Sequence, residues 1–176
     1  MPDYTPAGMD VTEAIETQRA VRRFADRPIE APALDAILDA GRRAPSSMNH
    51  QRWSFVLVAE RDRLRELAAV GEYADHIAGA AAVVALVVPD AEDADERESI
   101  AFDLGQCAQN LMLRAWELGI GSAHASVYDE PLARRLLGYP EGFRCDYVLS
   151  FGYPERTPSQ PGDRKPLDEL VHRERW

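Results

Sequence analysis

The feature that most constrains the fold is the uninterrupted apolar run AVVALVV, from Ala82 to Val88. A strand with this sequence is apolar on both faces, so both faces must be covered. The usual cover is a layer of helices packed against each side of a sheet. The run is too short to cross a bilayer, which takes about 20 apolar residues in a helix. We therefore expect a central, buried strand here.

The rest of the chain alternates between strand and helix patterns. Aromatic and β-branched residues or their alternation predict further strands at Trp53–Ala59, Ser122–Ser126 and Cys145–Gly152. Apolar spacing and end signals predict helices from an N-cap at Thr12 to about Gln18, and at Glu30–Ala44, Arg61–Val70, Glu98–Leu118 and Glu130–Leu137. From Tyr153 onward, prolines and glycines favour an extended tail. The pattern predicts an α+β fold, with a mixed central sheet flanked by helices, in one domain spanning residues 1–176.

The long helix predicted at Glu98–Leu118 is apolar around most of its circumference. One apolar stripe includes Ile100, Leu104 and Leu111, and Phe102 lies on another side. Only a narrow polar line remains, at Asp103, Gln106, Asn110 and Glu117. Such a helix needs more than one packing partner. It is either a core helix within one subunit or a helix buried partly against a second subunit.

The charge of the chain is −10, which opposes binding to nucleic-acid phosphates and to anionic lipid surfaces. A basic island nevertheless interrupts the acidic sequence, at Arg19, Arg22, Arg23 and Arg27. Arginine presents a planar fork of donors that suits phosphate oxygens, and Ala20 would let a ligand approach the backbone. The island is therefore a candidate site for a small anion, although a solvated helix end would have the same composition.

Two further segments carry polar groups suited to a ligand. Between a predicted helix and a predicted strand, Ser46 offers a hydroxyl, and Asn49 and Gln51 offer amides that can pair with the edge of a heteroaromatic ring. The same residues are also typical of an ordinary turn. In the tail, Arg164 is a candidate third phosphate ligand, or an exposed charge.

Other kinds of site have little support. The cysteines, Cys107 and Cys145, lie far apart in apolar segments and are expected to be buried thiols. The histidines lack the short spacing of a metal site. Gly119 and Gly121 follow a helix and do not form a dinucleotide-binding fingerprint. The N-terminal sequence has no signal-peptide pattern, so we expect a cytoplasmic protein.

Taken in order, these segments resemble the FMN-dependent nitroreductase family. The family pattern R-A-x-R-x-F is matched from Arg19 to Phe24, and A-P-S-x-x-N-x-Q-x-W from Ala44 to Trp53. Further matches are the D-x-G-x-x-x-Q-N core from Asp103 to Asn110, L-G-I-G from Leu118 to Gly121, G-Y-P from Gly152 to Pro154, and R-x-P-L-x-E-L from Arg164 to Leu170. Two departures are Gln18, where many members have arginine, and Arg52, where proline is usual.

The resemblance implies a homodimer whose extended C-terminal tail embraces the partner, with FMN at the interface. It implies an oxidoreductase that passes hydride from NADH or NADPH, through FMN, to a small organic acceptor: a nitroaromatic, quinone, enone or free flavin. It requires no metal and no catalytic side chain, because the flavin carries the chemistry. The residues that it assigns to FMN binding are Arg19, Ala20, Arg22, Ser46, Asn49, Gln51, His124, Ala125, Ser126 and Arg164.

Other functions of the same fold stay open at this point. A flavin carrier would bind FMN without being reduced by a nicotinamide. A flavin-fragmenting or dehalogenating relative would use reduced flavin for another reaction.

Overall fold

The computed structural model describes residues 8–156 and 164–176. Its sheet has the strand order β1-β2-β4-β3, in which β1 is Ser54–Val58, β2 is Ala82–Pro89, β4 is Phe143–Gly152 and β3 is Gly121–Ser126. All three neighbouring pairs of strands are antiparallel. The predicted strands are thus confirmed, and β2 lies in the interior of the sheet with residues 82–88 buried.

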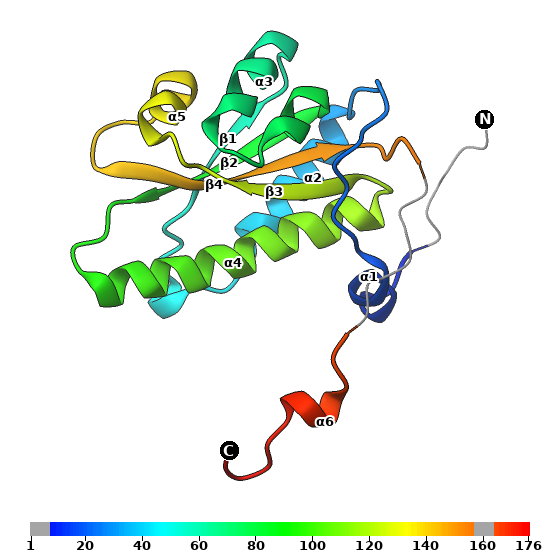
Figure 1. Cartoon of the computed structure of the whole chain (residues 1–176), viewed down its shortest axis with the longest axis vertical. Coiled ribbons are helices and arrows are strands. Elements are labelled where there is room, and N and C mark those ends of the chain that lie inside the picture. The colour runs from blue at the N-terminus through cyan, green and yellow to red at the C-terminus, as the bar shows by residue number, and fades with distance from the viewer. Residues whose placement is uncertain (1–7, 157–163) are drawn as a thin grey trace.

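Helices cover both faces of this sheet (Figure 1). One face carries α2 (Ala31–Arg42) and α4 (Ala94–Glu117), and α1 (Val11–Thr17) lies against the end of α4. The other face carries α3 (Arg61–Leu67), α5 (Glu130–Leu137) and the 3₁₀ turns η2 (Ala68–Val70) and η3 (Asp75–Gly79). The α+β class and the two helical layers are therefore as predicted.

The sheet is less mixed than the sequence suggested. Among the described residues, the parallel pairing is the isolated bridge between Ala20 and Ser122, which lies outside the named strands. Helices and strands alternate with few crossovers of equal length, which predicted a mixed sheet. Here, however, the segment that contains α3 returns β2 antiparallel to β1, and β4 pairs between β2 and β3.

Two helices begin earlier than predicted. Helix α4 begins at Ala94, because the Asp93 side chain caps it by accepting from the amide of Glu96 at 2.8 Å. The sequence predicts an acidic, solvated loop from Pro89 to Asp95. The end of this run is instead the first turn of α4, where Asp95 and Glu96 interact favourably with the positive end of the helix dipole. Helix α1 begins at Val11, with Asp10 as its N-cap in place of Thr12.

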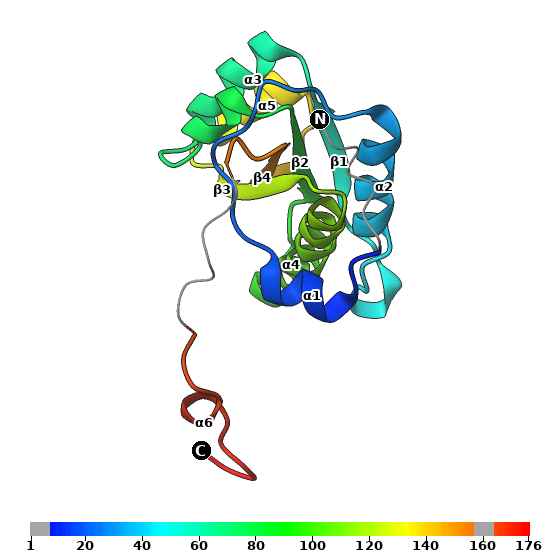
Figure 2. The same ribbon diagram turned by 90° about the vertical axis from the view of Figure 1, so that its right-hand side faces the viewer.

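The tail contains a short helix that sequence reasoning missed. Helix α6 (Leu167–Leu170) makes a single turn after Pro166, and it lies away from the sheet (Figures 1 and 2). The apolar side chains of α6 are exposed, as are two that follow it; the set is Leu167, Leu170, Val171 and Trp176. Pro166 at the N-cap position is thus compatible with one helical turn after it.

Helix α4 has one buried side and one open side. Ile100, Leu104 and Leu111 are buried against the sheet, as the stripe predicted, whereas Phe102 is 71% exposed. Packing within one chain therefore accounts for part of the apolar surface of α4.

Among the described residues, no helix has the length and apolar character needed to span a membrane.

Candidate functional site

The part of the basic island from Arg19 to Arg22, called the basic segment below, lies along the free edge of β3. The amide of Val21 donates to the carbonyl of Ser122 at 2.8 Å, and Ala20 forms a bridge with the same residue. A Cβ atom built on Gly121 would lie 2.6 Å from Cβ of Val21, so glycine at this position permits the close approach. Two sets of predicted cofactor ligands, at Arg19–Arg22 and at His124–Ser126, are thereby brought side by side.

Alternate residues of this segment face opposite ways. Val21 is buried, whereas Ala20 and Arg22 are exposed. The guanidinium of Arg19 turns back on α1, where Nη2 donates to the carbonyl of Glu16 at 2.6 Å. Its Nε is buried and has no hydrogen-bond partner. A buried donor without a partner is costly, so this N–H is a group that a bound anion would satisfy.

The edge of β3 also presents backbone groups. Because the carbonyl of Ser122 bonds Val21, the backbone groups of Ser122 point away from β4. Residues two apart along a strand point the same way, so the amides of His124 and Ser126 face this outer edge as well. Within the described chain, the bridge to Ala20 is the pairing made with this edge.

Beside this edge, on the side of α4, lies an apolar cavity of about 270 Å³. His124 and Tyr147 line it from the sheet, and Leu104, Ala108 and Met112 line it from α4. His124, whose amide faces the outer edge of β3, thus also lines the wall of this cavity. The cavity is the concave, mostly apolar kind of site that binds cofactors.

The loop that contains Ser46, Asn49 and Gln51 has an unusual backbone. Met48, Asn49 and Gln51 have positive φ values of 51°, 60° and 51°. Each such residue other than glycine costs about 1–3 kcal/mol, and strain of this kind collects at functional sites. The hydroxyl oxygen of Ser46 accepts from the amide of Gln51 at 2.9 Å, which holds the three predicted ligands in one compact turn.

The loop is fixed to α4 by Asp103. Both carboxylate oxygens of Asp103 lie 3.0 Å from the amide nitrogen of Ser47, which donates to them. Asp103 is 2% exposed, so this is a buried contact of a charged group. The sequence placed Asp103 on a polar line of the helix but did not predict this role. In the same line, Asn110 donates to the carbonyl of Ala40 in α2 at 3.2 Å.

The loop and the basic segment are not brought together within one chain. The basic segment follows α1, whose Thr17 accepts a hydrogen bond from Trp116 at the far end of α4. From Asp103 to Trp116 the helix rises about 20 Å. Arg164, the predicted ligand from the tail, lies on the segment that leads away from the sheet (Figure 2).

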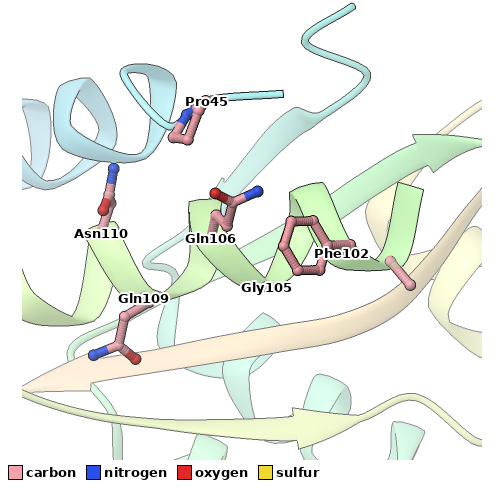
Figure 3. A pocket seen from close by; sticks show the side chains of 7 residues that line it. Pro45, Phe102, Gly105, Gln106, Gln109 and Asn110 are labelled. Carbon is pink, nitrogen blue, oxygen red and sulfur yellow. The ribbon is translucent and has the colours of Figure 1, made fainter. Parts of the chain in front are cut away.

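The open side of α4 forms a shallow hollow with Pro45 (Figure 3). Phe102, Gly105 and Gln109 line it, and a Cβ atom built on Gly105 would have no neighbour within 4 Å. Figure 3 shows Gln106 and Asn110 turned toward the side of α2 and Pro45, and Gln109 turned to the other side. Small residues beside an exposed ring leave room for another helix to approach.

The described side chains show no activated nucleophile. Burial raises the pKa of the Cys107 thiol to about 12, and burial likewise raises that of Cys145 to about 12. Both cysteines are buried thiols, as predicted, and a thiol of high pKa is a poor nucleophile. In the described ranges, no group of acidic, histidine and cysteine side chains is arranged to hold a metal ion.

The residues present fit a flavin phosphate cofactor. The orphaned Nε of Arg19 and the exposed Arg22 supply cationic donors, and Ala20 leaves the backbone between them open. The apolar cavity and the edge amides of β3 supply a place for the ring.

His76, on the other face of the sheet near this edge, was not singled out from the sequence, because a lone histidine in a turn carries no spacing signal.

Comparison with known proteins identifies similar chains over nearly the whole length. A family model described as the nitroreductase family matches residues 15–78 and 69–153. A relative from Methanothermobacter thermautotrophicus, named for NADH dehydrogenase and NAD(P)H nitroreductase, is 33% identical over 96% of this chain and 88% of its own. The NADPH-flavin oxidoreductase of Vibrio harveyi is 29% identical over 93% of this chain and 73% of its own.

Solved structures agree with these sequence matches. The structure of the NADPH:FMN oxidoreductase from Vibrio harveyi, in complex with NAD+, aligns with a TM-score of 0.84 at 26% identity. The alignment covers 94% of this chain and 77% of that one. Nitroreductase A from Vibrio parahaemolyticus aligns with a TM-score of 0.87 at 25% identity, over 96% and 77% of the two chains.

Removing the buried carboxylate should release the loop. We expect Asp103→Ala to lower the free energy of unfolding by about 1–3 kcal/mol, because the amide of Ser47 loses its acceptor. Asp103→Asn keeps one acceptor oxygen and should cost less. Urea denaturation measures the stability, and hydrogen exchange at the Ser47 amide locates the change. Equal stability of the two variants, with unchanged exchange, would contradict the anchoring role.

Proposed function

The chain belongs to the nitroreductase family, and we propose on this premise that it is an FMN-dependent oxidoreductase. It takes hydride from NADH or NADPH and passes electrons to a small organic acceptor. The observation that carries this proposal is the basic segment fixed to the edge of β3 beside an apolar cavity. The names of the relatives, an NADPH-flavin oxidoreductase and an NADPH:FMN oxidoreductase among them, support the choice of cofactor and donor.

Each part of FMN has residues suited to it. Arg19 and Arg22 bind the phosphate, with Arg164 as a third ligand, and Ala20 allows the phosphate to approach the backbone. The backbone from His124 to Ser126 lies beside the ring and donates hydrogen bonds from its edge amides. Ser46, Asn49 and Gln51 pair with the polar edge of the ring from the second subunit.

Bound FMN supplies the redox chemistry, by accepting hydride from the nicotinamide and returning electrons to the acceptor. The protein binds and orients the cofactor. The positive charge of Arg22 stabilises an anionic ligand bound nearby, by the same electrostatics that shift the pKa of a neighbouring group. Leu104 and Met112 keep water from the floor of the cavity. The apolar lining suits a planar acceptor such as a nitroaromatic or a quinone, and no side chain is assigned a proton transfer.

We also propose that the active unit is a homodimer of single-domain subunits spanning residues 1–176. The open side of α4, with Phe102 and Gly105, is one contact surface. The exposed apolar residues of the tail are another, because Leu167 and Leu170 are 74% and 59% exposed among the residues that the structure describes. Helix α4 rises about 20 Å between Asp103, which anchors the loop, and Trp116, which contacts α1. A dimer spans this length if each site combines the loop of one subunit with the basic segment of the other.

The redox proposal is tested under anaerobic conditions. We expect the purified protein to bind FMN at one per subunit, and NADH or NADPH to bleach the absorbance of the bound flavin. Addition of a quinone or a nitroaromatic should restore it. Flavin that is bound but reduced by neither nucleotide would identify a flavin carrier instead.

Truncation of the phosphate ligands should weaken FMN binding selectively. A charge-assisted contact contributes about 1.5–3 kcal/mol, so Arg22→Ala should raise the dissociation constant roughly ten- to hundredfold. Arg19→Ala should also weaken binding. Arg65→Ala is the control, because Arg65 is an exposed arginine paired with Asp62 on the far face of the sheet. Fluorescence titration measures the affinities, and equal losses in all three variants would refute a localised clamp.

The dimer is tested on the open side of α4. Phe102→Asp should produce a folded monomer that has lost FMN, since Phe102 is 71% exposed and contributes little to the core. Tyr73→Asp, at a 70% exposed aromatic residue between η2 and η3, should leave the dimer intact. Light scattering gives the mass, and the melting temperature of the intact protein should rise with its concentration. A native monomer that binds and reduces FMN would exclude this arrangement.

A further inference from the structure

His76 lies outside the cavity, on the face of the sheet opposite α4, and is linked to β3 by hydrogen bonds. Its Nδ1 lies 2.9 Å from Oγ of Ser150, and this hydroxyl donates to the carbonyl of Ala123 at 3.1 Å. A hydroxyl has one hydrogen, so when it bonds Ala123, Nδ1 of His76 must be the protonated nitrogen. The neutral ring then carries its lone pair on Nε2.

Nε2 of His76 is buried and has no hydrogen-bond partner in the described structure. Buried polar atoms are nearly always bonded, so an exception calls for an explanation. The backbone of His124 lies close enough to favour the protonated ring. A proton on Nε2 would therefore turn an unpartnered acceptor into a donor directed at the strand that presents the edge amides.

The charges around His76 oppose that proton in the free protein. Burial lowers its pKa most, and Arg22 lowers it further, as does the ring of His124, while the backbone of His124 and the carboxylate of Asp75 act the other way. Of the neighbouring elements, η2 has no titratable side chain, and Arg61 of α3 is paired with Asp26 and bonds the carbonyl of Ala80. Arg22 is thus the charge that a phosphate ligand would change.

We propose that His76 takes up a proton from solvent when the phosphate of FMN binds at Arg22, and that the protonated ring then holds the edge of β3 in place. The inference rests on the proposed function. A phosphate dianion pairs with Arg22 and adds its own negative field, and both effects favour the imidazolium. No covalent bond forms: a proton moves from water to Nε2, which then donates toward the backbone of His124. His76 is accordingly a positioning residue.

Proton uptake is measured by calorimetry of FMN binding at about pH 7, close to the ordinary range of a histidine. Repeating the titration in buffers of different ionisation enthalpy gives the number of protons taken up. We expect a net uptake by the wild-type protein, and a loss of this uptake in His76→Gln. His172→Gln, at a histidine in the tail, should retain it. Riboflavin, which lacks the phosphate, should bind the wild-type protein without uptake.

A measurement on the wild-type protein removes dependence on the variant. Nuclear magnetic resonance of the His76 ring should show a titration midpoint that rises on addition of FMN. An unchanged midpoint, or full proton uptake by His76→Gln, would overturn the inference while FMN binding and reduction by nicotinamide remain. A protein that binds no FMN would overturn both this inference and the proposed function.

Discussion

From Ala82 to Leu86, every side chain of β2 is excluded from solvent, with alternate residues in two separate core clusters. Each cluster needs its own layer of helices, which places α2 and α4 on one face and α3 and α5 on the other. Strand β3 is at the edge of the sheet, farthest from this two-sided core. The candidate site lies at that edge because it is where backbone donors are left for a ligand.

The position of the basic segment depends on two glycines, Gly121 and Gly152, which have no side chain. Val21 occupies the space beside Gly121, and Phe24 occupies the space beside Gly152, whose built Cβ would lie 2.7 Å from the ring of Phe24. These contacts set the path of the chain on both sides of Arg22. The site is therefore positioned by packing, with the charged groups carried on a segment whose apolar neighbours fix it to the sheet.

Patterns with a local physical cause were predictable from the sequence, and those with a distant cause were not. The apolar residues of β2 and the stripe through Leu104 on α4 gave the strand and the helix, since burial sets their periodicity. The first turn of α4 was missed because its acids resemble a solvated loop. Residue identity alone did not predict the left-handed backbone at Met48 or the anchor at Asp103, because both arise from contacts between distant segments. The separation of the loop from Arg22 arises only when the chain folds, so the sequence pattern of the two segments did not predict it.

The loop around Met48 also has a consequence for the order of folding. The left-handed backbone conformation of its residues is seldom populated in an unfolded chain. Its buried anchor, Asp103, is 56 residues from Ser47 in the sequence. Closing so long a segment costs entropy before any contact compensates for it. The loop therefore acquires its shape only after α4 has docked on the sheet. In a chain growing from its N-terminus, this part of the binding surface is completed well after its own residues are synthesised.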